Sequence, residues 1–136
     1  MTAPRTIAIG IGCERKADET EIWALIEAAL TEAKVAPETV ACIASIASKV
    51  EEPALHGIAQ RLGVPLRFFE ADRLERETPR LKNPSDLVYR ETGCHGVAEG
   101  AALAVVGAAG DLILPKRRSA HATCALARIN AGATRA

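Results

Sequence analysis

Apolar runs and helical apolar patterns alternate along the first half of the chain. Residues 6–13 (TIAIGIGC) and 40–46 (VACIASI) are nearly continuous apolar runs, which are typical of buried strands. A shorter run at 66–69 has the same character. Between these runs, apolar residues recur at helical spacing: Ile22, Ile26, Ala29, Leu30 and Ala33, then Leu55, Ile58, Ala59 and Leu62. The order strand, helix, strand, helix, strand predicts a parallel βαβ start.

Local signals mark the ends of both predicted helices. Asp18 lies three residues before Glu21, which resembles a capping box with Asp in the Ser/Thr position. Pro53 suits the first turn of the second helix, and Gly63 suits the position just after its end. Trp23 lies off the apolar stripe, so we expect it to be partly exposed or to face a partner.

The pattern changes after the third strand. Residues 70–83 are rich in charge and contain proline, so we expect an exposed loop with at most a short helical turn. A short helix is predicted at 85–91. An alanine-rich helix is predicted at 97–106, where small side chains suit close contact with a sheet.

Two further strands are predicted at 111–114 and 122–129. Because the connection at 115–120 is short, we expect these strands to form an antiparallel hairpin. The sequence thus predicts an α/β fold: a single domain over residues 1–136 with three α/β/α layers. Its sheet would be mostly parallel, of about five strands, with an antiparallel edge hairpin. We expect residues 131–136 to be a frayed tail.

Composition limits the function classes. The 136 residues include 17 Lys and Arg and 17 Asp and Glu, so the formal net charge is zero. Nucleic-acid and membrane-surface proteins usually carry a basic excess, so neither partner is expected. No apolar run is long enough to span a membrane, and no secretory signal is recognisable. We therefore expect a cytoplasmic protein.

Cysteine spacing indicates neither a zinc site nor disulfides. The four cysteines, Cys13, Cys42, Cys94 and Cys124, are far apart and include no Cys-x-x-Cys pair. We expect Cys42 and Cys124 to be small core residues of the strands. The sequence predicts no metal site and no cofactor of its own.

Five separated blocks of sequence follow one family pattern in order. They are GIGCERKADETEI (10–22), IASIASKVEEPAL (43–55), LGVPLRFF (62–69), ETGCHGVAEGAAL (91–103) and LILPKR (112–117). Together they resemble the CobE/CbiG C-terminal domain family of cobalamin (vitamin B12) biosynthesis, and the chain looks like the CobE form. The sequence departs from the family pattern at Ala47, where an Asp is common, and at Cys94 and His95.

The resemblance implies a role in corrin-ring metabolism. In this family the domain occurs alone as CobE in the aerobic pathway. It also forms the last part of CbiG proteins, which are cobalt-precorrin hydrolases that open a ring lactone and release acetaldehyde. The ligand it implies is a corrin-ring intermediate of the precorrin or hydrogenobyrinic acid type, which carries several acetate and propionate arms.

Two glycine-bearing segments are candidate ligand-binding sites. Gly10, Gly12 and Cys13 end the first strand, where glycine lets the backbone approach a ligand. Gly93, Cys94 and Gly96 precede the alanine-rich helix, whose amino terminus favours anions. Each segment has an alternative interpretation, a tight turn for the first and a helix cap for the second.

Two lysines follow predicted strands. Lys49 comes after the second strand and Lys116 follows the apolar stretch 112–114, and both match the family pattern. Ligands of open parallel sheets bind at the carboxyl ends of strands. Ammonium groups there would bind the carboxylate arms of a corrin intermediate. The alternative is that the run Lys116–Arg118 is a solvated turn.

Three residues are candidate acids or bases, and three functions remain open. A lactone hydrolase or tautomerising enzyme would need a general acid or base in the pocket, and the candidates are His95, Glu99 and His121. The first hypothesis for the function is a binding protein that protects or delivers a corrin intermediate, and the enzyme just described is the second. The third is an accessory subunit of another cobalamin-pathway enzyme, with Trp23 and residues 70–83 as possible contact surfaces. For Glu99, a solvent-facing position is the favoured interpretation.

Overall fold

The computed structural model describes residues 4–130. The expectation of a frayed tail at 131–136 falls outside them. The main elements are β1 (Ile7–Cys13), α1 (Glu19–Ala33), β2 (Val40–Ile46), α2 (Pro53–Leu62), β3 (Leu66–Phe69), α3 (Ala71–Glu75), α4 (Asp86–Thr92), α5 (Val97–Val106), β4 (Asp111–Arg118) and β5 (Ala122–Arg128). Short 3-10 turns lie at η1 (Pro37–Thr39), η2 (Ala47–Lys49) and η3 (Thr78–Arg80).

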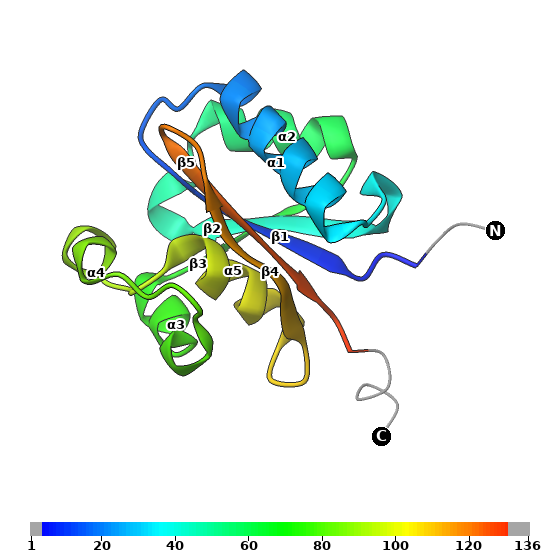
Figure 1. The fold of residues 1–136 in the computed structure, drawn as a ribbon. Coiled ribbons are helices and arrows are strands. Elements are labelled where there is room, and N and C mark those ends of the chain that lie inside the picture. The colour runs from blue at the N-terminus through cyan, green and yellow to red at the C-terminus, as the bar shows by residue number, and fades with distance from the viewer. Residues whose placement is uncertain (1–3, 131–136) are drawn as a thin grey trace.

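The strands form one five-stranded sheet in the order β3-β2-β1-β5-β4 (Figure 1). β1, β2 and β3 are parallel neighbours, with Ile9 opposite Ile43. β5 returns antiparallel to β1 and to the edge strand β4. The predicted mixed sheet with an antiparallel hairpin is confirmed.

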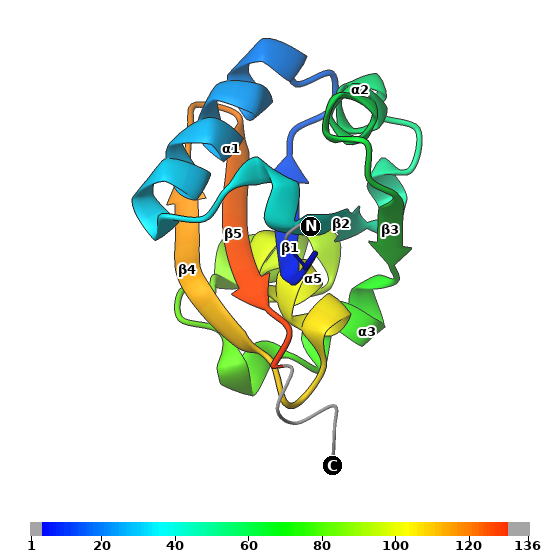
Figure 2. The same cartoon turned by 90° about the vertical axis from the view of Figure 1, so that its right-hand side faces the viewer.

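Helices cover both faces of the sheet. In Figure 1, α1 and α2 lie above the sheet, and α5 and α3 lie below it. In Figure 2, α1 and α2 are again at the top and α3 is at the lower right. This arrangement confirms the predicted α/β/α layers. No helix among residues 4–130 is long and apolar enough to cross a membrane.

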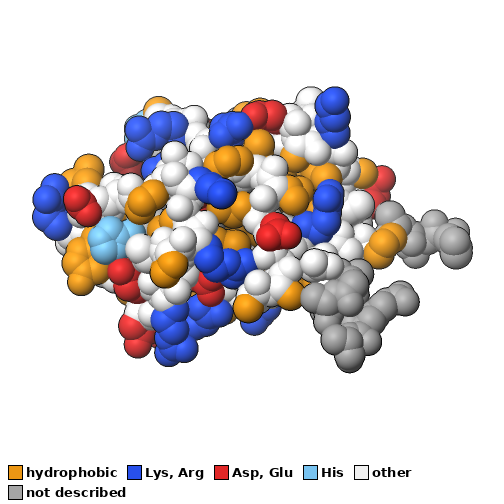
Figure 3. Space-filling model, turned by 60° about the horizontal axis from the view of Figure 1, so that its bottom comes forward, with side chains coloured by type: hydrophobic (Ala, Val, Ile, Leu, Met, Phe, Trp, Pro, Cys, Tyr) orange, Lys and Arg blue, Asp and Glu red, His pale blue; other side chains and the backbone are white. Residues whose placement is uncertain are grey.

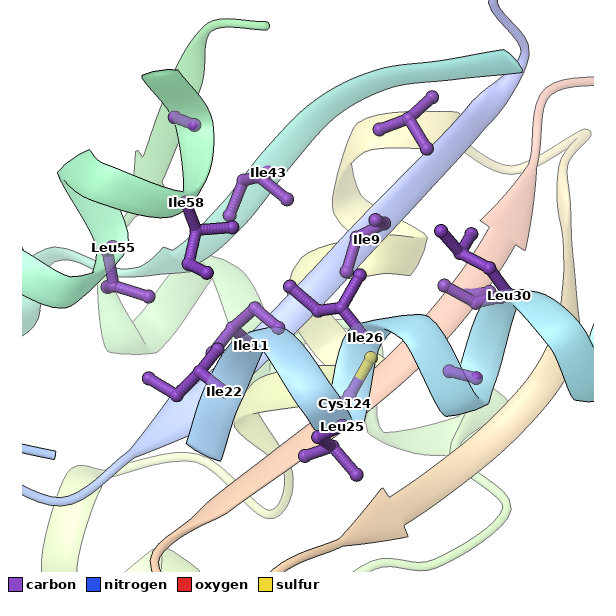
Figure 4. Packing of buried hydrophobic residues seen from close by; sticks show 14 of the residues in the cluster. Ile9, Ile11, Ile22, Leu25, Ile26, Leu30, Ile43, Leu55, Ile58 and Cys124 are labelled. Atoms are coloured by element: carbon purple, nitrogen blue, oxygen red, sulfur yellow. The ribbon is translucent and has the colours of Figure 1, made fainter. Parts of the chain in front are cut away.

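The α1–α2 side encloses the larger core. Ile9 and Ile11 from β1 meet Ile22 and Ile26 from α1, and every one of these side chains is fully or almost fully buried (Figure 4). Cys124 from β5 is part of the same cluster, in agreement with the sequence prediction. A nearly all-aliphatic core of this kind stabilises the fold through the burial of apolar surface.

On the other face of the sheet, helix α5 packs directly against the strand backbone. A Cβ atom built on Gly10 in β1 would lie 1.9 Å from the Ala98 carbonyl oxygen of α5. The helix therefore rests on the strand backbone, and the alanines of α5, including Ala101 and Ala102, are fully buried against the sheet. Gly10 is required for this approach because any side chain there would overlap the helix backbone.

The segment 70–83 differs from the prediction. It is not an exposed loop, because α3 and η3 occupy most of it, and Leu74 is buried against α5. Glu77 is also buried and accepts hydrogen bonds from Arg73 at 2.8 Å and Arg80 at 2.9 Å. Figure 3, which brings the bottom of Figure 1 forward, shows Lys and Arg side chains on this side with Asp and Glu among them. Part of the charge pattern therefore comes from ion pairs to the buried Glu77.

Two smaller predictions also need correction. Strand β4 continues to Arg118 through register irregularities after Leu112 and Leu114, so Lys116 lies in a strand and not in the turn. Asp18 caps α1 as expected and accepts from the Thr20 N–H at 3.3 Å. Glu21, however, does not complete a capping box, because its carboxylate binds the β4–β5 hairpin instead.

Replacing Gly10 tests the close contact between β1 and α5. We expect Gly10→Ala to lower the free energy of unfolding by about 2 kcal/mol or more, because the new methyl overlaps helix backbone that cannot rotate away. Gly63→Ala is the matched control: nothing lies within 4 Å of the added atom, and only the positive φ of 68° is strained. That strain costs about 1 kcal/mol. Urea unfolding measures both, and equal losses would contradict this packing.

Candidate functional site

A cavity of about 580 Å³ opens at the carboxyl ends of β1 and β2. Gly12 and Cys13 from β1, Lys49 from η2 and the first turn of α5 line one part of it. The end of β4, the β4–β5 hairpin and α4 line the rest. In Figure 1 these segments gather on the left of the molecule.

The topology explains why the cavity lies at this edge. From β1 the chain crosses to β2 through α1 on one face, whereas it reaches β4 through α5 on the other face. Connections that leave in opposite directions open a crevice outside the carboxyl ends of the strands, which is where ligands of open α/β sheets bind. The antiparallel β5 lies between β1 and β4 in the sheet, and its first residues, Ala122 and Thr123, line the cavity.

The structure separates the glycine and cysteine candidates into two groups. Gly12, Cys13 and Gly96 line the cavity. Gly10 lies beneath α5 and does not line it, and Gly93 ends α4 with a positive φ of 89°. Cys94 is fully buried in a smaller apolar cluster with Leu74 and Ala101, and its Sγ lies 3.4 Å from Thr92 Oγ1.

Cys13 is present in the cavity as a thiol. Burial raises the pKa of its thiol to about 11, although the nearby Lys49 ammonium acts in the opposite direction. A nucleophilic cysteine needs the thiolate form at working pH. Cys13 therefore lines the cavity as a neutral, polarisable thiol and is not an activated nucleophile.

The first turn of α5 faces the cavity without a side-chain cap. Gly96 is the N-cap residue and supplies no side chain, and Gly96, Val97, Ala98 and Glu99 all line the cavity. Backbone N–H groups at a helix amino terminus bind anions, with help from the helix dipole. This turn can therefore receive a carboxylate.

Cations from separate segments surround the same space. Lys49 from η2, Lys116 and Arg118 from β4, and Arg15 from the segment after β1 all line the cavity. Carboxylates on its wall come from Glu14, Glu91 and Glu99. The sequence analysis selected Lys49 and Lys116 but not Arg15, although Arg15 lies within the first block, 10–22.

Glu99 joins three segments behind the cavity. Its side chain is on α5 and only 2% of the residue is exposed, so the solvent-facing interpretation was wrong. The carboxylate accepts hydrogen bonds from the N–H groups of Lys82 (2.9 Å), Asn83 (3.0 Å) and Lys116 (2.8 Å), and from Asn83 Nδ2 (2.9 Å). It thereby fixes β4 where its register is irregular and directs Lys116 to the cavity.

These donors also keep Glu99 ionised. Burial raises its pKa, but the hydrogen bonds from Asn83, Lys116 and Lys82 outweigh burial and hold the pKa below the ordinary value of 4.5. A carboxylate whose oxygens already accept four hydrogen bonds is a poor proton acceptor. Glu99 is therefore an anchor for the site. Asn83, its main side-chain partner and a cavity residue, carried no signal in the sequence.

The two candidate histidines occupy different places. His95 does not line the cavity: its Nδ1 lies 2.8 Å from Glu75 Oε2, and its ring stacks on Tyr89 with centroids 4.5 Å apart. His121 does line the cavity, at the tip of the β4–β5 hairpin, with Nδ1 2.9 Å from Glu21 Oε1. Among residues 4–130, no group of three His, Cys, Asp or Glu side chains is arranged to hold a metal ion.

The family described as Cobalamin synthesis G C-terminus matches residues 7–127. The chain belongs to this family. Over 121 residues it is 50% identical to Protein CobE of a Sinorhizobium species, covering 89% of this chain and 79% of that protein. Over 126 residues it is 32% identical to a cobalt-precorrin-5A hydrolase of Priestia megaterium, of which it spans only 33%.

Solved structures of cobalamin biosynthesis proteins have the same fold. The crystal structure of CobE, a protein from the cobalamin biosynthetic pathway, superimposes with a TM-score of 0.86 at 37% identity, covering 96% of this chain and 94% of that one. The protein chiG of Agrobacterium tumefaciens gives 0.70 at 30% identity, with 91% and 98% covered. The chain is thus a cobalamin biosynthesis protein, as the five sequence blocks indicated.

Replacing Glu99 tests its anchoring role. We expect Glu99→Gln to lower the free energy of unfolding by about 2 kcal/mol at neutral pH, because an amide places a donor against N–H groups that need an acceptor. Urea unfolding measures the loss. Glu38→Gln, at an exposed carboxylate in η1, is the control and should change little.

The stability loss in Glu99→Gln should depend on pH. The folded pKa of Glu99 is below its unfolded value, so its contribution is present above the unfolded pKa and disappears as pH falls through the folded pKa. The difference in stability between wild type and Glu99→Gln should therefore shrink on acidification. A difference that stays constant between neutral and acid pH would show that the Glu99 charge does not stabilise the fold.

Proposed function

We propose that this protein binds a corrin-ring intermediate of the precorrin or hydrogenobyrinic acid type in the cavity at the carboxyl ends of β1 and β2, and so protects or delivers it. The observation that carries the proposal is the convergence of Lys49, Lys116 and Arg118 with the open first turn of α5 on one cavity. Membership of a cobalamin biosynthesis family supplies the ligand class.

The cavity chemistry matches such a ligand in two respects. Ammonium and guanidinium groups bind carboxylates through charge-assisted hydrogen bonds, and the intermediate carries several carboxylate arms. Ile46, Val88 and Val97 supply apolar wall against which the ring can lie. Small-molecule sites commonly combine an apolar lining with a few convergent polar groups in this way.

Three of the candidate acidic, basic and nucleophilic groups favour binding over catalysis, whereas the fourth, His121, lines the cavity. Glu99 has its acceptor capacity filled, Cys13 is held as a thiol, and His95 is engaged outside the cavity. The hydrolase of Priestia megaterium is about three times the length of the matched part, so its activity is not transferred. A lactone hydrolase or tautomerising enzyme remains the alternative, and a time-dependent change in the chromophore would favour it.

A role as accessory subunit of another pathway enzyme has less support. Trp23 on α1 is half-buried, and the Arg61 guanidinium lies 4.0 Å from its ring centroid. The segment 70–83 is packed on α5 through Leu74. Part of each surface is therefore already in contact with the rest of the chain. Co-purification with other pathway enzymes is the test of this alternative.

Binding is measured by visible-absorbance titration with hydrogenobyrinic acid and its precursors, followed by gel filtration. We expect the pigment to coelute with the protein and its chromophore to stay unchanged. Lys49→Gln and Lys116→Gln should each weaken binding about two- to fivefold, because each removes one exposed or half-exposed positive charge from the cavity.

Lys34→Gln is the matched control. It neutralises an exposed lysine just after α1 that does not line the cavity, so the affinity should not change. Pigment that never coelutes would contradict the proposed function. An equal loss in all three lysine variants would mean that the pigment responds to overall charge and not to this cavity.

A further inference from the structure

The tip of the β4–β5 hairpin is held on the first turns of α1 by one carboxylate. Glu21 on α1 accepts a hydrogen bond from Ser119 Oγ, one from the His121 N–H at 2.7 Å, and one from His121 Nδ1 at 2.9 Å. The Ser119 N–H also closes the hairpin on the Ala122 carbonyl at 2.9 Å. Two of the bonds to Glu21 do not involve the imidazole, so the ring is not needed to hold the tip.

The hydrogen bond to Glu21 fixes which nitrogen of His121 is free. An ionised carboxylate can only accept a hydrogen bond. In the neutral ring the proton is therefore on Nδ1, which donates to Glu21, and Nε2 is the unprotonated nitrogen. Within residues 4–130, no group forms a hydrogen bond with Nε2. His121 lines the cavity beside Arg118 and Ser119, so a ligand there has access to this atom.

Charges from several elements act on the ring. Glu21 from α1 contributes most, and Glu14 from the segment after β1, whose N–H binds the His121 carbonyl at 3.0 Å, adds to it. Both raise the pKa of His121 above its ordinary value of 6.5. Arg118 from β4 and Arg15 are the positive groups that line the cavity on this side. The ring is therefore protonated up to a higher pH than an ordinary histidine, and the imidazolium form carries an N–H at Nε2.

We propose that His121 is a ligand-binding residue that donates from its imidazolium Nε2 to a carboxylate of the bound intermediate, with Glu21 as its positioning residue. This inference rests on the proposed function and makes binding dependent on pH. Affinity is full while the ring is protonated and falls as pH rises through the His121 pKa. The ligand carboxylates stay ionised throughout this range, because their pKa values lie well below it.

The test is the same titration with hydrogenobyrinic acid, repeated from about pH 6 to about pH 8.5, where histidine titrates. We expect the affinity of the wild type to fall about two- to fivefold across this range, which is the size of one partly exposed ionic contact. His121→Gln should bind as weakly as the wild type does at high pH, and with no dependence on pH. His56→Gln, on an exposed α2 histidine outside the cavity, should keep the wild-type profile.

Glu21→Gln tests whether the Glu21 carboxylate acts on the His121 ring or only holds the hairpin in its folded position. The amide oxygen can still accept from Nδ1, but the negative charge is gone, so the pH profile should keep its shape and move to lower pH. A profile unchanged in both His121→Gln and Glu21→Gln would overturn the inference while leaving the proposed function intact. Absence of pigment binding at every pH would overturn the proposed function, and the inference with it.

Discussion

The contact between α5 and β1 determines where the cavity lies and what lines it. Because Gly10 has no side chain, the backbone of α5 reaches the strand at Ala98, and the helix cannot slide without meeting the sheet. This placement brings the uncapped first turn of α5 to the carboxyl end of β1, beside Gly12. It also puts Glu99, one position after Ala98, under β4.

Glu99 connects the helix α5, whose position is set by the contact with β1, to the segments that line the cavity. Its buried carboxylate accepts from the backbone of Lys116 on one side and of Lys82 and Asn83 on the other. A buried charge is stable only when it is fully hydrogen-bonded, so the three segments must meet here. The Lys116 N–H binds Glu99 in the stretch where the register of β4 is irregular, and Lys116 lines the cavity there. Lys49 reaches the same space independently, from the turn after β2.

Much of the fold could be predicted from the sequence because its signals are local. The buried runs at 7–13 and 40–46, the stripe on α1 and the alanine-rich pattern of α5 report directly on strands, helices and close packing. The segment 70–83 was misjudged because a buried carboxylate with two arginine partners has the same composition as a solvated loop. Periodicity could not distinguish the two.

The site was less accessible to sequence reasoning because its contacts join distant residues. Glu21 occupies a normal capping-box position, yet it binds His121 one hundred positions away. Glu99 and Asn83 are sixteen positions apart and have no motif in common. Lys49 and Lys116 were found because they follow strands, where parallel sheets place their ligands. Gly10 matched the same rule, but the structure assigns it to helix packing.

The most direct measurement of the central claim is amide chemical-shift mapping on ¹⁵N-labelled protein titrated with hydrogenobyrinic acid. We expect the largest shifts to cluster at the cavity, at Gly12, Lys49, Gly96 and Lys116. Amides on the opposite edge, such as those of Val40 and Asp111 at the starts of β2 and β4, should stay in place. Shifts centred on that opposite edge, or spread evenly over the surface, would contradict it.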